Sequence, residues 1–277
     1  MFFSNKNSLD GGPVRGYCKK ERCHMTGVYL SGTGNTRHCV KKLLSLLDES
    51  ARAVPLESPS AVEAIQGEEW ILLAYPTQFS NAPIFVRDFI KTHAALWQGK
   101  KVFCLTTMGL FSGDGTGCTA RLLKKRGADV VGGLQIRMPD AVCDSKALKK
   151  SLAENREIVA MADGKIEAAA ESIKKGVYPQ EGLRLVDHLA GLLGQRLWFY
   201  GKTLHYSRQL NIHDSCIGCG LCAKQCPMGN LRMERGRPVP GGHCTMCYRC
   251  VSSCPQKAIT LLGKAVVEQC RFESYRV

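Results

Sequence analysis

Two short runs of cysteine constrain this chain more than any other feature. Each run has the spacing Cys-x2-Cys-x2-Cys-x3-Cys followed by proline, and the second begins 28 residues after the first. The chain has 15 cysteines in 277 residues and shows no apolar secretory leader, so ligation of a metal or cluster explains them better than disulfides. The two runs comprise Cys216, Cys219, Cys222, Cys226, Cys244, Cys247, Cys250 and Cys254.

Structural zinc is the alternative for these runs. Zinc sites also use Cys-x2-Cys pairs, but each site takes four ligands. Zinc would not require two runs that each have three closely spaced cysteines and a fourth cysteine before proline. The remaining cysteines have no common spacing, which argues against a third cluster, and Cys104 falls in a predicted buried strand where it would behave as a small hydrophobe. They are Cys18, Cys23, Cys39, Cys104, Cys118, Cys143 and Cys270.

The stretch 204–262, which is rich in cysteine, glycine and proline, resembles the bacterial ferredoxins that carry two [4Fe–4S] clusters. Its spacing is the documented signature of that family, in which the fourth cysteine of each run ligates the other cluster. The resemblance implies one cluster on Cys216, Cys219, Cys222 and Cys254. It implies a second cluster on Cys226, Cys244, Cys247 and Cys250. In this family each cluster carries one electron.

Upstream of the cysteines, strand and helix patterns alternate from Met25 onward. The apolar runs at 70–75 (WILLAY) and 101–107 (KVFCLTT) are typical of strands buried on both faces. Further strands are predicted at 25–30, 53–56 and 129–138, with helices at 35–47, 83–96 and 116–125. Five strands separated by helices predict an α/β fold with a doubly wound, parallel, five-stranded sheet.

A loop of small residues follows the first predicted strand and leads directly into a helix. Its backbone N–H groups can converge, and the hydroxyls of Ser31, Thr33 and Thr36 add donors, so a phosphate can sit at the positive end of the helix. The loop matches neither an NTP-binding P-loop nor a G-x-G-x-x-G turn. An ordinary glycine and serine turn is the alternative. The loop comprises Ser31, Gly32, Thr33, Gly34, Asn35 and Thr36.

This loop is similar to the flavodoxin phosphate loop, [ST]-x-T-G-x-T, and the resemblance covers 25–160. It implies a flavodoxin-like sheet with FMN at the carboxyl ends of strands one, three and four. Phe79, Met108 and Phe111 are candidates to flank the flavin ring, although both phenylalanines would suit the core equally well. The expected contacts from the two loops at these ends are Pro76, Thr77, Gln78, Phe79, Ser80, Asn81, Thr107, Met108, Gly109, Leu110, Phe111, Gly113 and Asp114.

The parts divide the chain into five segments. We expect a disordered extension at 1–24, a flavodoxin-like domain at 25–178, a helical connector at 179–203, a small α+β ferredoxin domain at 204–262 and a tail at 263–277. His188 and Arg196 argue against a membrane role for the amphipathic connector. No apolar stretch approaches the ~18 residues that a membrane span needs, so we expect a cytoplasmic protein.

The chain is basic, with a formal net charge of +14. Two thiolate-bound clusters and a flavin phosphate would lower this charge to roughly +8. Such a balance favours an acidic redox partner, such as a ferredoxin, a flavodoxin or a reductase; a solvated basic surface is the alternative. No run of lysine and arginine is interleaved with aromatic residues, which argues against nucleic-acid binding.

The order of the parts resembles the flavodoxin–ferredoxin fusion proteins of anaerobic bacteria. This resemblance implies electron transfer between FMN, which holds one or two electrons, and two [4Fe–4S] clusters that each pass one. One alternative is a flavin-dependent reductase of a small molecule fed by its own ferredoxin domain, with Asp114 and Gln78 as the polar candidates over the flavin. Another is a docking module that has lost FMN and keeps the clusters.

Overall fold

The computed structural model describes residues 24–276, apart from the side chains at positions 199, 200, 202 and 204. Cys18, Cys23 and nearly all of the extension predicted at 1–24 lie outside the described residues.

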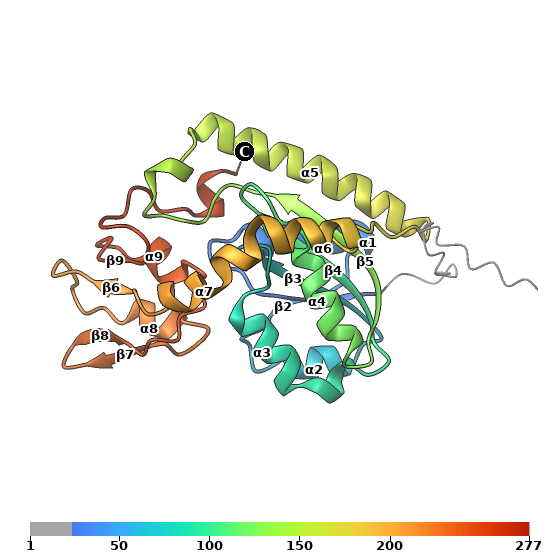
Figure 1. Cartoon of the computed structure of the whole chain (residues 1–277), viewed down its shortest axis with the longest axis horizontal. Coiled ribbons are helices and arrows are strands. Elements are labelled where there is room, and N and C mark those ends of the chain that lie inside the picture. Colours follow the sequence, from blue (N-terminus) through green and yellow to red (C-terminus); the bar gives the residue numbers. More distant parts are fainter. Residues whose placement is uncertain (1–23, 277) are drawn as a thin grey trace, which may run out of the picture.

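A five-stranded parallel sheet forms the N-terminal part of the molecule (Figure 1). Its order, β2-β1-β3-β4-β5, is that of flavodoxin-like sheets. The strands are β1 (Thr26–Tyr29), β2 (Ala53–Pro55), β3 (Trp70–Pro76), β4 (Lys101–Met108) and β5 (Asp129–Arg137). β3 and β4 are buried except at their ends, which explains their continuous apolar runs. The predicted doubly wound sheet is confirmed.

Helices cover both faces of this sheet. α1 (Asn35–Leu47) and α5 (Leu152–Lys174) pack on one face, where Leu43 and Ile166 are fully buried. The other face carries α2 (Ala61–Gln66), α3 (Ile84–Thr92), the 3-10 turn η1 (Ala94–Trp97) and α4 (Gly115–Lys124). A capping box between Ser151 and Glu154 starts α5.

The connector is a continuous helical rod that lies along the sheet and reaches the C-terminal part (Figure 1). It consists of α6 (Leu185–Gly191), the π-helical turn η3 (Leu192–Arg196) and α7 (Leu197–Tyr206). A π turn adds a residue to the helical repeat, and here the consecutive residues Gln195 and Arg196 both reach the loops of the sheet. The rod continues beyond the predicted connector, which ended at residue 203.

The C-terminal part is a small α+β domain with a core of its own. Its two antiparallel ladders pair β6 (Asn211–Ile212) with β9 (Ile259–Thr260), and β7 (Leu231–Glu234) with β8 (Arg237–Pro240). Two short helices, α8 (Leu221–Gln225) and α9 (Arg249–Ser253), lie between the ladders in sequence. In the described part of the chain, no helix combines the length and the apolar character needed to cross a membrane.

Two segments fasten this domain to the sheet. After β5 the chain passes through the 3-10 turn η2 (Lys146–Leu148), and the carboxylate of Asp144 accepts the N–H groups of Leu261 and Leu262 at 2.6 and 2.9 Å. The tail returns through η4 (Phe272–Ser274) to the sheet. There the N–H of Phe272 donates to the carbonyl of Thr33 at 2.9 Å, and its ring stacks on His38. The two parts are therefore interlocked.

Candidate functional site

The eight cysteines of the two runs gather around two small cavities. One cavity is lined by Cys216, Cys219, Cys222 and Cys254. The other is lined by Cys226, Cys244, Cys247 and Cys250. Each cavity therefore takes three cysteines from one run and the fourth from the other. We call them the first and the second cluster cavity.

Local backbone structure explains this crossing. The third cysteine of each run lies within a short helix, α8 or α9, and the fourth follows that helix as its C-cap in an extended conformation. A residue before proline disfavours the helical conformation, so Pro227 and Pro255 end the helices at Cys226 and Cys254. The chain then turns away from the first three thiols, and the fourth thiol faces the other cavity.

The chemistry of these thiols fits a cluster. Burial raises the pKa of Cys244 to about 12 and also raises the pKa values of Cys222, Cys247 and Cys250, so thiolates there need a positively charged partner such as iron. Backbone N–H groups donate to the sulfurs of Cys216, Cys226, Cys244 and Cys254. Among the described residues, no three His, Cys, Asp or Glu side chains are arranged to hold a single metal ion.

A third cavity, of about 380 Å³, opens at the carboxyl ends of β1, β3 and β4. This volume lies within the usual range for small-molecule sites. We call it the flavin cavity. Most of the residues predicted to contact FMN line it, namely Ser31, Gly32, Thr33, Asn35, Thr36, Pro76, Thr77, Gln78, Phe79, Thr107, Met108, Gly109, Leu110 and Phe111.

Five residues expected at the flavin do not line this cavity: Gly34, Ser80, Asn81, Gly113 and Asp114. Asp114 shows the reason most clearly. Its carboxylate is fully buried and bound by Arg121 at 2.6 Å, by His188 at 2.8 Å and by Arg196. Asp114 thus anchors the connector to the loop after β4, and it is not placed to act as an acid or base over a flavin.

The phosphate loop offers polar atoms to an occupant of the flavin cavity. The hydroxyls of Thr36 and Thr107 share a hydrogen bond of 2.8 Å across two strand ends. Asn35 donates its amide to the carbonyl of Pro139 at 2.7 Å, but its Oδ1 is buried without a partner among the described residues. An unpaired buried acceptor is costly. An occupant with hydroxyl groups, such as the ribityl chain of FMN, would supply the missing donor.

The cavity also has walls that sequence reasoning missed. Strand β5 ends at the same edge of the sheet as β1, β3 and β4, so applying the carboxyl-end rule to β5 as well would have found residues 138–142. The other walls come from Leu148 in η2 and from the distant connector and C-terminal domain, and no local signal marks them. The additional residues are Met138, Pro139, Asp140, Ala141, Val142, Leu148, Gln195, Tyr206, Met246, Cys247, Tyr248 and Leu262.

Asp140 is the carboxylic acid in this set. Its carboxylate accepts the N–H of Val142 at 2.7 Å and lies beside Gly109. Burial raises the pKa of Asp140 above its ordinary value. A carboxyl group that keeps its proton to higher pH therefore lines the flavin cavity.

Cys247 and Tyr248 line both the flavin cavity and the second cluster cavity. Met246 and Tyr248, on either side of Cys247, have left-handed backbones with φ of 55° and 61°. Each such conformation costs a non-glycine residue about 1 kcal/mol or more. The hydroxyl of Tyr248 donates to Asp144 at 2.9 Å, which helps hold the loop in place. The two cavities are thus separated by a wall only one loop thick.

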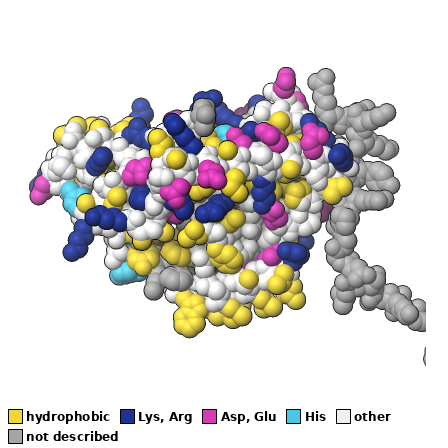
Figure 2. Space-filling view, turned by 90° about the horizontal axis from the view of Figure 1, so that it is seen from above, with side chains coloured by type: hydrophobic (Ala, Val, Ile, Leu, Met, Phe, Trp, Pro, Cys, Tyr) yellow, Lys and Arg dark blue, Asp and Glu magenta, His cyan; other side chains and the backbone are white. Residues whose placement is uncertain are grey.

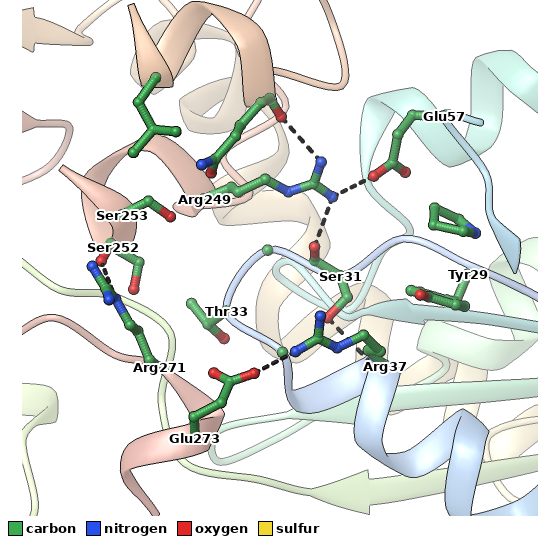
Figure 3. Close-up of a pocket in the computed structure, with 15 residues that line it drawn as sticks. Tyr29, Ser31, Thr33, Arg37, Glu57, Arg249, Ser252, Ser253, Arg271 and Glu273 are labelled. Atoms are coloured by element: carbon green, nitrogen blue, oxygen red, sulfur yellow. Dashed lines mark hydrogen bonds and ion pairs between the residues drawn. The ribbon is translucent and has the colours of Figure 1, made fainter. Parts of the chain in front are cut away.

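A polar cavity of about 480 Å³ lies on the other side of the phosphate loop, at the seam between the two parts (Figure 3). Arg249 crosses this seam from α9. Its guanidinium donates to the carbonyl of Ser31 at 2.8 Å and to that of Gln225 at 3.0 Å, and it pairs with Glu57 at 2.5 Å. Arg249 therefore joins the phosphate loop to both short helices that carry the cysteines.

Residues 215–259 match the family described as a 4Fe-4S dicluster domain. The chain joins a flavodoxin-like sheet to a ferredoxin-type segment that matches this family. One component of the ion-translocating oxidoreductase complex of Methanosarcina acetivorans is 49% identical to it over 47 residues, which are 17% of this chain. The match spans only 18% of that relative.

Solved flavodoxins resemble the N-terminal part. One from the domain Archaea is 17% identical, with a TM-score of 0.39, and the match covers 55% of this chain and 99% of that one. Two-electron reduced Megasphaera elsdenii flavodoxin is 26% identical, with a TM-score of 0.39 and coverages of 53% and 98%. Fusobacterium nucleatum flavodoxin bound to flavin mononucleotide is 19% identical, with a TM-score of 0.40 and coverages of 56% and 98%.

Proposed function

We propose that this chain transfers electrons between FMN in the flavin cavity and two [4Fe–4S] clusters in the two cluster cavities. The observation that carries the proposal is the wall of Cys247 and Tyr248, which the flavin cavity shares with the second cluster cavity. FMN supplies one- or two-electron chemistry when bound, and each cluster passes one electron. The protein's contribution is to hold the two sites at a fixed, short separation.

The chain's own residues set the order of the carriers. Cys247 lines both the second cluster cavity and the flavin cavity, so the second cluster cavity is the one next to the flavin. Cys219 of the first cluster cavity is exposed, and its neighbour Ile217 is 63% exposed. The first cluster site is therefore the outlet toward a partner.

Basic side chains lie on one side of that outlet, together with the exposed Glu234. The β7–β8 hairpin lies beside the first cluster cavity, because Pro238 lines the cavity and the carbonyl of Gly236 lies against Gly218. Arg232, Arg235 and Arg237 of this hairpin are exposed. A positive rim at an electron outlet favours a negatively charged partner and raises the rate of encounter. We infer that the partner is an acidic redox protein.

Cofactor content tests the proposal directly. The full chain, purified under argon, should hold about eight iron atoms and about eight sulfides. It should also release about one FMN per chain on denaturation. Stoichiometric zinc with little sulfide would refute the cluster assignment, and clusters without flavin would favour a docking module that has lost FMN.

Asp140 favours a second candidate function, reduction of a small molecule at the flavin. A carboxyl group with a raised pKa in the flavin cavity can hold a proton for a reduced substrate. In that case Asp140→Asn would abolish turnover of the substrate while leaving electron exchange between flavin and clusters intact. Equal loss in both assays, or in neither, would remove this candidate.

A further inference from the structure

The connector rod turns its polar side chains toward the protein and its apolar side chains toward solvent. Its polar side chains face the protein: His188 and Arg196 both bind the buried carboxylate of Asp114, and Gln195 accepts the hydroxyl hydrogen of Ser80 at 2.7 Å. His188 and Arg196, which argued against a membrane role, therefore bind a partner inside the protein and do not make the outer side of the rod polar.

The opposite side of the rod is exposed and apolar. We define the connector face as Leu185, Val186, Leu189, Leu193, Leu197 and Trp198, which are between 48% and 74% exposed. The other exposed positions in the described part of 185–201 are alanine and glycine, so no described side chain on this side of the rod is charged. Figure 2 shows hydrophobic side chains gathered along this edge of the molecule.

The face extends beyond the rod and is bounded by cations. Phe111 of the loop after β4 packs close to Gly194 and is 47% exposed, and its neighbour Leu110 is 67% exposed. Arg184, which is 72% exposed and pairs with the mostly buried Asp187 at 3.4 Å, lies before the first residue of the face, and Arg208 lies exposed beyond its last. The sixteen-residue rise from Leu185 to Gly201 makes the uncharged side roughly 24 Å long.

We propose that the connector face binds the surface of a bilayer that contains anionic lipids. A helix with leucine and tryptophan on one side and cations at its flanks is suited to lie in the lipid headgroup region, with its apolar side chains among the acyl chains. The formal net charge of +14, roughly +8 with the proposed cofactors bound, adds attraction to an anionic surface. The binding is peripheral.

The composition of the face distinguishes a lipid surface from a protein partner. Protein interfaces combine an apolar centre with hydrogen-bonding groups, and leucine and valine are under-represented among their energetic hot spots. The described side chains of the connector face are leucine, valine and one tryptophan. The indole N–H of Trp198 already donates to the carbonyl of Leu193 at 2.9 Å. Among the described side chains of the face, no polar group therefore lacks a hydrogen-bond partner that a bound protein could supply.

Vesicle flotation under argon tests the proposal with the full, cofactor-loaded chain. Phosphatidylcholine vesicles with about one third phosphatidylglycerol should carry the protein up the gradient, and pure phosphatidylcholine vesicles should carry less. Leu189→Glu with Leu193→Glu should lower the bound fraction about tenfold or more. The matched control, Leu152→Glu with Met161→Glu, places the same charges at exposed apolar positions of α5 and should bind as wild type.

Trp198 provides a second readout. Trp97 is fully buried and Trp70 lies partly within the sheet core, so a shift of emission to shorter wavelength on adding vesicles reports Trp198. Trp198→Phe should remove that shift. The visible absorption of the clusters shows that each variant is folded. The proposal is overturned if the wild-type protein does not float with the vesicles, or if the double glutamate variant floats to the same extent as wild type. A dimer in light scattering that vesicles do not dissociate, and that the glutamates abolish, would assign the face to a second copy.

Discussion

The α-carbon of Gly32 lies against the carbonyl of Cys247, so closely that a methyl group on Gly32 would come within 1.7 Å of the carbonyl oxygen. Gly32 belongs to the phosphate loop, and Cys247 to the wall of the second cluster cavity. The backbone of Gly32 is not left-handed, so the close approach, and not its φ angle, requires glycine. The flavin cavity and the cluster domain touch through backbone atoms at this point.

Replacing Gly32 with alanine should separate these two loops. The added methyl group cannot fit, because the atom it meets is backbone and cannot rotate away. We expect a loss of about 1–3 kcal/mol of stability from overpacking, and slower electron transfer from reduced flavin to the clusters. Stopped-flow reduction followed at the cluster absorption measures the rate, and urea unfolding measures the stability. Gly164→Ala is the control, because its methyl group meets nothing within 4 Å. Equal transfer rates in both variants would contradict the prediction.

Asp144→Asn should weaken the attachment of the C-terminal domain. Although burial opposes it, hydrogen bonds from Leu261, Gly263, Tyr248 and Leu262 lower the pKa of Asp144. A lowered pKa stabilises the fold above the usual pKa of the group, and this contribution disappears as pH falls through the lowered value. We expect a loss of about 2–4 kcal/mol at neutral pH, since buried donors lose a charged acceptor.

The difference between wild type and Asp144→Asn should stay constant down to about pH 4 and shrink below it. Urea unfolding followed by circular dichroism under argon gives the free energy at each pH. Asp88→Asn, at an exposed carboxylate, should change the stability little at any pH. A difference that grew as the pH fell would have the wrong sign for this assignment.

Cys226→Ala should damage the cluster held by the other run of cysteines. Cys226 lines the second cluster cavity together with Cys244, so the EPR spectrum of reduced Cys226→Ala should resemble that of Cys244→Ala. Cys216→Ala serves as the comparison, because Cys216 lines the first cluster cavity. If the spectrum of Cys226→Ala matched that of Cys216→Ala instead, each run would serve one cluster by itself.

Thr33→Val and Thr36→Val should weaken FMN binding. The hydroxyls of Thr33 and Thr36 lie in a loop without a lysine, so affinity has to rest on neutral donors and on the end of α1. Each change should cost roughly 1–3 kcal/mol of binding free energy, the usual cost of removing a donor to a buried charged acceptor. Fluorescence titration with FMN gives the dissociation constant. Ser45→Ala, on the exposed side of α1, is the control and should leave it unchanged.

Reversing the charge of Arg235 and Arg237 should slow electron transfer to an acidic partner. Both arginines lie on the exposed hairpin beside the first cluster cavity, and Arg237 pairs with the fully exposed Asp214 and donates to the carbonyl of His213. The second-order rate with an acidic ferredoxin should fall about tenfold or more at low salt and should lose its steep salt dependence.

Lys124→Glu with Lys125→Glu is the matched control for this charge reversal, because α4 ends at the edge of the sheet opposite the flavin cavity. That variant should keep the rate and the salt dependence of wild type. Rates that stay flat across a salt series in all three proteins would show that the hairpin arginines only solvate the loop.

Much of this structure could be predicted from local sequence patterns. Burial on both faces gives β3 and β4 their continuous apolar runs, and the proline after each fourth cysteine turns the chain at a defined residue. These features depend on neighbours in sequence, so they could be predicted. The walls of the flavin cavity at Tyr206 and Tyr248 depend on how the C-terminal domain docks, and no local periodicity encodes that docking.

Two expectations were wrong because the residues concerned bind partners elsewhere in the fold. Asp114 follows a strand at the correct edge for a flavin contact, but Arg121, Arg196 and His188 bind its carboxylate. His188 and Arg196 were expected to argue against a membrane role for the connector, whereas the structure turns both side chains inward onto Asp114. In both cases the chemistry of the residue type is evident from the sequence, and its partner lies too far away in sequence to be visible.

The flavin cavity is closed by residues from both halves of the chain, from Ser31 in the first loop to Leu262 beyond the last cysteine. Neither half encloses it alone. When the ribosome has synthesised the whole sheet, only part of this cavity therefore exists. Part of the remaining wall is the loop at Cys247, which also lines the second cluster cavity. We therefore expect both cofactor sites to form only when the two halves dock, so that loss of the clusters would also weaken retention of flavin.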